Sequence, residues 1–143
     1  YYVFMKHKII ASFMAVVAFL GVLDTSYLTY KQLLDKDIVC SLVDGCEIVL
    51  NSTYATVLGI PLSTIGLIYY LTLLILAVLL IKITSRSIAK LHFSLTTLGL
   101  IFSSYLVYLQ AVVINSWCQY CLVSAGTTTL LFILSLTYIL NKK

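Results

Sequence analysis

Two pairs of cysteines are the residues of this sequence best suited to chemistry. Cys118 and Cys121 lie in the stretch 115–121, where polar residues, an indole and two thiols interrupt an apolar tract. Ser116 and Gln119 have the spacing of a capping box, which predicts that a helix begins there with Cys118 in its first turn. Free backbone amides and the positive end of the helix dipole stabilise a thiolate at that position. Cys121, on the same helical face, is close enough to form a disulfide with Cys118 or to act as a second reactive thiol.

The second pair, Cys40 and Cys46, lies in the polar stretch 31–61 that follows the first apolar segment. Asp44 and Glu47 repeat the cap-and-return spacing in acidic form, which predicts a short helix with Cys46 in its first turn. That position activates a thiol, whereas the neighbouring carboxylates oppose its ionisation. The tract that follows, 47–58, is amphipathic, and we expect it to lie at the membrane face as a lid over the helices.

The composition indicates a membrane protein. Of the 143 residues, 62% are hydrophobic and 10% are charged, which is more apolar than an ordinary soluble domain. A helix needs about 20 apolar residues to cross a bilayer, and four segments meet this requirement. We therefore predict an all-α membrane protein with a single domain over 1–143, a four-helix bundle with an outer loop and short helix over its pocket. The predicted spans are 9–30, 62–81, 93–114 and 119–140, with Pro61 at the first position of the second helix.

The basic residues predict the orientation of the bundle. Seven of the nine flank the membrane side that both termini share: Lys6, Lys8, Lys82, Arg86, Lys90, Lys142 and Lys143. Lys31 and Lys36 lie on the other side with four of the five acidic residues. The positive-inside rule therefore predicts cytoplasmic termini and cysteines that face a periplasmic, extracellular or lumenal space. We assign the net charge of +4 to this topology rather than to nucleic-acid binding.

One acidic residue lies within a predicted span, and two histidines lie in the flanks of the spans. Asp24 lies inside the first span, where a carboxylate is costly and is a functional candidate by default. Hydrogen bonding near Thr25 and Ser26 is the structural alternative for Asp24. His7 and His92 stand alone in basic flanks, and we expect both to be solvated.

Aromatic residues gather at the predicted outer boundary. They are Trp117, Tyr27, Tyr30, Tyr54 and Tyr120. Such residues commonly anchor a protein at the membrane interface. The same rings could instead form the wall of a pocket.

Four outward cysteines allow three interpretations. Structural disulfides fit an even cysteine count in an exported protein, but a Cys-x-x-Cys pair closes a loop too short to stabilise much. A zinc site needs converging thiolates, for which the oxidising side and the spacing of Cys40 and Cys46 are unfavourable. Covalent haem attachment requires a histidine after the second cysteine, where Leu122 stands.

The third interpretation is a dithiol relay. The loop pair would exchange with a soluble partner and pass its electrons to the pair at the bilayer surface, each step requiring a thiolate that attacks a disulfide and a second thiol that resolves the mixed species. The final acceptor would be a lipophilic two-electron carrier, for which a quinone is suited. We find no pattern typical of a flavin, nicotinamide, haem or metal site.

The combination of these features resembles the vitamin K epoxide reductase family. The shared features are four helices, a loop cysteine pair after the first helix, and Trp117 followed by the Cys118/Cys121 pair at the start of the fourth. The tract 51–54 leading to 59–63 is similar to bacterial members, and this resemblance implies a multi-pass protein of a bacterial or archaeal cell membrane. The alternative is the DsbB-like disulfide-forming proteins, which also use quinone but carry Cys-x-x-Cys in the first outer loop.

The resemblance implies a role for each cysteine. Cys121 would be the thiol nearest the quinone, which would be a menaquinone, vitamin K or ubiquinone. Cys118 would pair with Cys121 and form a mixed disulfide with Cys46 during turnover. Cys40 would exchange with a separate thioredoxin-like or DsbA-like protein, so that the chain forms disulfides in that partner.

Two positions depart from the family pattern. Animal members contact quinone through an Asn before the second helix and a Tyr one turn after the motif, and the nearest positions here are Tyr54 and Ala125. We therefore expect different quinone contacts, and reduction of quinone rather than of an epoxide. The remaining alternative is a non-enzymatic scaffold, stapled by disulfides or holding zinc. The candidate quinone contacts are Cys121, Tyr54, Asn51, Asp24 and Trp117.

Overall fold

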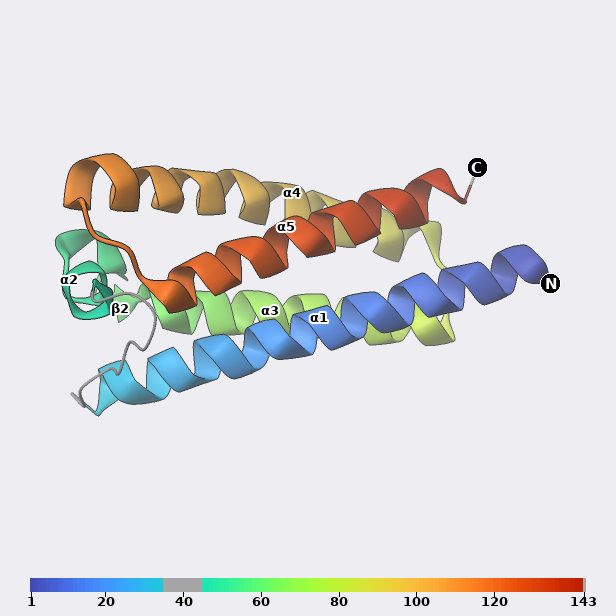
Figure 1. Cartoon of the computed structure of the whole chain (residues 1–143). Helices are drawn as coiled ribbons and strands as arrows, with labels where there is room; N and C mark the ends of the chain where they lie inside the picture. Colours follow the sequence, from blue (N-terminus) through green and yellow to red (C-terminus); the bar gives the residue numbers. More distant parts are fainter. Residues whose placement is uncertain (35–44, 143) are drawn as a thin grey trace.

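The computed structural model describes residues 1–34 and 45–142, and its long helices form one elongated bundle (Figure 1). Four helical segments are long and apolar enough to cross a membrane, which confirms the predicted all-α class. They are α1 (Tyr2–Leu33), α3 (Leu62–Lys82), α4 (Arg86–Tyr108) with its π-helical continuation η2 (Leu109–Ile114), and α5 (Gln119–Leu140). At their basic ends α1 and α4 extend beyond the predicted spans, because Lys and Arg are good helix formers whose charged heads reach water.

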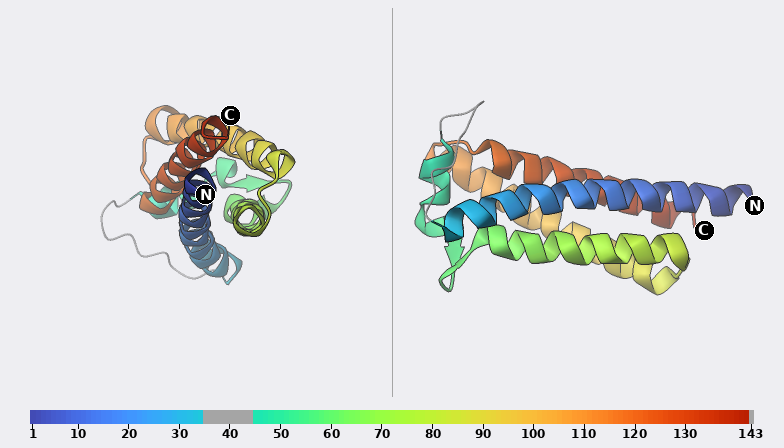
Figure 2. Two further views of the ribbon diagram at one scale, coloured as in Figure 1. Left: turned by 90° about the vertical axis from the view of Figure 1, so that its right-hand side faces the viewer. Right: turned by 90° about the horizontal axis from the view of Figure 1, so that it is seen from below.

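The helices pack around one main core. α1 packs chiefly on α3, and α4 chiefly on α5, while α1 also contacts α5. The core includes the fully buried Met14, Tyr70, Leu73, Leu131 and Tyr138. Both termini lie at the same end of the bundle, opposite α2 and β2 (Figures 1 and 2), as an even number of spans requires.

At the end opposite the termini, residues 45–61 form what we call the outer cap. It contains α2 (Cys46–Leu50), η1 (Thr53–Ala55) and a hairpin of β1 (Thr56–Val57) and β2 (Ile60–Pro61). Leu58 and Gly59 both have positive φ, as a two-residue hairpin loop requires. The hairpin delivers Pro61 as the N-cap of α3, so the helix begins one residue later than predicted.

Gln32 connects the outer cap to the bundle. Its Nε2 donates to the Leu50 carbonyl at 3.4 Å, and its Oε1 accepts a hydrogen bond from the Ser63 hydroxyl. These two bonds tie the end of α1 to α2 and to the start of α3. The outer cap is therefore fixed over this end of the helices.

The start of α2 differs from the prediction in one respect. The short helix exists with Cys46 as its first residue, but its N-cap is Gly45, without a side-chain capping bond. The predicted cap, Asp44, lies outside the described residues.

The prediction that His7 and His92 are solvated is wrong. His7 is 4% exposed and His92 is fully buried. The His7 ring packs edge-on against Tyr138, with ring centroids 4.9 Å apart, and His92 Nδ1 lies 3.1 Å from the Ser135 hydroxyl. Because α1 and α4 continue past the predicted spans, both histidines face α5 rather than water.

Candidate active site

Cys118 stands at the start of α5, in a different position from the one predicted. α5 begins at Gln119, and Cys118 itself is the N-cap. Asn115 adopts a left-handed conformation with φ 54°, and the Ser116 amide donates to the Gln110 carbonyl at 3.1 Å. The predicted capping box of Ser116 and Gln119 is therefore wrong, because the chain is still turning away from η2 at Ser116. Cys118 takes the N-cap position without a side-chain capping bond.

This position activates the Cys118 thiol. A hydrogen bond from the Cys121 thiol lowers the pKa of Cys118 from 9.0 to about 7, and the backbone amides of Cys121 and Tyr120 act in the same direction. Burial and the Asp24 carboxylate oppose this shift. The pKa is thus lowered, as predicted, but the Cys121 thiol is the main cause and the amides of the helix N-terminus contribute less.

Gln110 holds Cys118 in this position. Its side-chain Oε1 accepts a hydrogen bond from the Cys118 amide at 3.0 Å, and Gln110 is only 2% exposed. It belongs to η2, and π-helical turns are frequent at functional sites. Gln110 was not predicted, although an amide side chain within an uncharged apolar span was a usable signal.

Cys46 lies close to the Cys118/Cys121 pair. Cys46 and Cys118 belong to one buried cluster with Leu28, Val49 and Leu50, against which Cys121 also packs. The backbones meet closely here, because a Cβ added at Gly45 would lie 2.5 Å from the Trp117 carbonyl oxygen. Cys46 is disulfide-bonded, whereas Cys118 and Cys121 are free thiols. Cys40 lies outside the described residues.

Beneath the thiols, the long helices line a half-open cavity of about 340 Å³. Cys121 borders it from α5 and Asp24 from α1, and Ala125 lies one turn after Cys121. Its size falls within the range of small-molecule sites. The remaining wall is largely apolar and includes Leu62, Ile65, Leu95, Leu98, Phe102 and Leu106.

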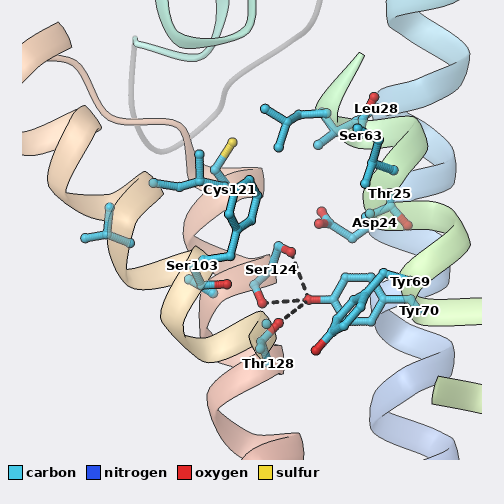
Figure 3. A pocket seen from close by; sticks show the side chains of 18 of the residues that line it. Asp24, Thr25, Leu28, Ser63, Tyr69, Tyr70, Ser103, Cys121, Ser124 and Thr128 are labelled. Carbon is cyan, nitrogen blue, oxygen red and sulfur yellow. Dashed lines mark hydrogen bonds between the residues drawn. The ribbon is translucent and has the colours of Figure 1, made fainter. Parts of the chain in front are cut away.

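Two tyrosines of α3 form part of the cavity wall. The Tyr70 hydroxyl lies 2.7 Å from the Ser124 carbonyl and 2.8 Å from the Thr128 hydroxyl (Figure 3). The Tyr69 hydroxyl donates to the Leu95 carbonyl at 3.0 Å. These bonds join α3 to α5 and α4 across the cavity. Neither tyrosine was predicted, because tyrosines are common in membrane helices and carry no spacing signal.

Asp24 differs from the other polar residues of the cavity wall. Figure 3 shows its carboxylate directed into the space between α1 and α5, on the side opposite Cys121. Its Oδ2 atom is buried and receives no hydrogen bond from the described residues. Such an atom requires an explanation, because buried polar groups are normally paired.

Three predicted quinone contacts lie elsewhere. Tyr54 and Trp117 are 44% and 40% exposed, and Asn51 is also exposed. They are not among the described residues that border the cavity, and as quinone contacts they stay predictions. Asp24 and Cys121 are the candidate contacts that this cavity brings together.

Comparison with known proteins agrees with this arrangement. Residues 12–136 match the vitamin K epoxide reductase family. The chain is also 37% identical over 121 residues to the thiol-disulfide oxidoreductase LTO1 of Arabidopsis thaliana. That similarity covers 79% of this chain and 32% of the plant protein, so the chain spans about a third of the length of this relative. The chain belongs to the vitamin K epoxide reductase family.

Proposed function

We propose that the chain is a membrane thiol-disulfide oxidoreductase that forms disulfides in a thioredoxin-like partner and transfers the electrons to a quinone. The observation that carries this proposal is the free Cys118/Cys121 pair at an apolar cavity inside the bundle. A dithiol in this place can reach a protein disulfide on one side and a lipid-soluble acceptor on the other.

The buried cluster supports exchange between Cys46 and Cys118. We call Cys118 and Cys121 the inner pair, and Cys40 and Cys46 the outer pair. After the acceptor has oxidised the inner pair, a Cys46 thiolate attacks the Cys118 sulfur, and the second thiol of the outer pair resolves the mixed disulfide. Cys40 is our candidate for that thiol and for exchange with the partner. A disulfide at Cys46 beside free Cys118 and Cys121 corresponds to the stage at which the inner pair holds two electrons.

The apolar wall supports a quinone as the acceptor. A quinone ring with part of its isoprenoid tail suits a cavity of about 340 Å³ that Cys121 borders. Menaquinone, vitamin K and ubiquinone share this chemistry. With the termini in the cytoplasm, as the basic residues predict, the outer cap faces the side on which disulfides form.

Counting alkylatable cysteines in membranes tests the proposal. We expect the number of reactive thiols in the full chain to rise with dithiothreitol and to fall when ubiquinone or menaquinone is then added. In a Cys121→Ala variant the quinone should cause no fall. A wild-type count that quinone leaves unchanged would instead indicate a stapled or metal-holding scaffold.

Cys40→Ser tests how electrons enter. We expect this variant to fail with a thioredoxin-like protein but to reduce quinone with dithiothreitol, because a small dithiol can reach the inner pair directly. Equal loss with both reductants would show that Cys40 does not contact the partner.

A further inference from the structure

We propose that Asp24 is a catalytic residue that donates a proton to the quinone as it is reduced in the cavity. The inference rests on the proposed quinone reduction. It concerns the protons that the quinone oxygens gain in that reaction.

Asp24 differs from polar neighbours in the cavity wall whose side chains are hydrogen-bonded. The Thr25 hydroxyl donates to the Gly21 carbonyl at 2.8 Å, and the hydroxyls of Tyr69 and Tyr70 are bonded to α4 and α5. Gln110 Oε1 accepts the Cys118 amide. The Asp24 carboxyl, by contrast, retains a buried oxygen without a partner among the described residues. An ionisable group placed at such cost inside a membrane span indicates a role in binding or proton transfer.

Asp24 interacts electrostatically with the thiols of Cys118 and Cys121 and with the Tyr70 hydroxyl. The titratable groups that border the cavity with it are Cys121 of α5 and Tyr69 and Tyr70 of α3, whereas the described wall from α4 contributes none. A quinone between α1 and α5 would therefore lie between the Asp24 carboxyl and the Cys121 sulfur.

The proposed step balances in protons and electrons. Cys118 and Cys121 lose two electrons and two protons as the S–S bond forms, and the quinone gains two of each to become the hydroquinone. Protonated Asp24 gives one proton to a quinone oxygen and recovers it from the Cys121 thiol. The Cys118 proton leaves to bulk water, and one proton from water completes the hydroquinone.

The test compares Asp24→Asn with the wild-type full chain in detergent or bilayers, using dithiothreitol and a short-chain ubiquinone. Because general acid catalysis contributes about 10²-fold or more, we expect kcat to fall by about that factor while KM for the quinone stays near the wild-type value. Asp24→Glu should be at least about tenfold faster than Asp24→Asn, because it restores the acid. Ser26→Ala, on the same helix but outside the cavity wall, is the matched control and should match wild type.

A second measurement separates catalysis from structure. Alkylation should show that Asp24→Asn still exchanges electrons between Cys46 and Cys118, and its melting temperature should not fall. Unchanged kcat in Asp24→Asn, equal rates for the Asn and Glu variants, or parallel loss of thiol exchange would each overturn the role of Asp24. If wild type itself does not reduce the quinone, the proposed function fails instead.

Discussion

The two ends of the bundle both bury polar side chains, yet they use them differently. At the end near the termini, His92 lies against Ser135 and His7 against Tyr138 within regular helices. At the outer end, Asp24 and Cys121 border open space. The comparison shows that a buried polar group alone does not identify a site in this protein. A cavity beside it and a reactive thiol within reach distinguish the outer end.

The backbone shows the same contrast. The described residues with positive φ are Leu58, Gly59 and Asn115, and all three lie at the outer end, as does the π-helical η2. Departures from regular geometry concentrate at functional sites when the surrounding structure holds them in place. The hairpin accounts for Leu58 and Gly59, so Asn115 and η2 are the departures that mark the outer end as the candidate site.

The largest effect should come from Cys121→Ser. Removing the thiol that borders the cavity should lower quinone reduction by at least about 10³-fold, as loss of an essential nucleophile does, while the helix content by circular dichroism stays unchanged. Thr137→Ser, an exposed change at the other end of α5, is the matched control. Normal turnover by the Ser variant would remove the functional difference between the two ends.

A smaller effect is expected in the pH dependence of Cys118 alkylation when Cys121 is replaced by Ala. Because its pKa is about 7 instead of 9.0, its thiolate is present above about pH 7 and is lost as the pH falls through that value. Cys121→Ala removes the main hydrogen-bond donor, so the midpoint for alkylation by iodoacetamide should move upward toward 9.0. At pH 7 the alkylation rate should fall by about tenfold. A midpoint that stays near 7 would mean that the backbone amides alone lower the pKa of Cys118.

A smaller change in rate is expected for Gly45→Ala. The new Cβ would lie 2.5 Å from the Trp117 carbonyl oxygen, so the outer cap must shift and move Cys46 relative to Cys118. Transfer between the two pairs, followed by rapid alkylation, should slow several-fold. Gly126→Ala, where a Cβ meets nothing within 4 Å, is the control. Equal transfer rates in the two variants would show that the close approach of Gly45 to Trp117 does not set the distance between Cys46 and Cys118.

The smallest effect on turnover is expected from His92→Ala, at the end of the bundle near the termini. His92→Ala leaves a cavity and an unpaired Ser135 hydroxyl, and should destabilise the protein by about 2–3 kcal/mol, measured by thermal unfolding. Turnover per folded molecule should remain at the wild-type level. Lys90→Ala, an exposed change on the same helix, should leave the stability nearly unchanged. A specific loss of turnover in His92→Ala would extend the functional region to the terminal end.

The spans were predictable from the sequence because the bilayer requires long apolar segments. Asp24 was identifiable for the same reason, since a carboxylate stands out in such a segment. The activation of Cys118 was also predicted, although the capping residue was not. The four residues 115–118 between η2 and α5 place the N-cap at Cys118 instead of Ser116, and short patterns such as Ser-x-x-Gln do not report such a turn.

Other features depend on contacts between distant segments. The burial of His7 and His92 depends on how α1 and α4 pack against α5, which a basic flank does not reveal. The joining of α3 to α5 by Tyr70 requires the small Gly21, since a Cβ there would lie 2.4 Å from the ring. Such pairings are tertiary and leave no local pattern.

Gln110 holds Cys118 from a part of the chain that is separate from the outer cap. Its backbone carbonyl accepts the Ser116 amide and its side chain accepts the Cys118 amide, so the inner thiol is held from the end of the third span. Under the proposed function, we expect the partner to meet the protein at the outer cap. The surface proposed to select a partner and the side chain that holds Cys118 would then belong to different parts of the chain. We expect the outer segment to be exchangeable between relatives, giving new partner specificity with the same inner redox pair.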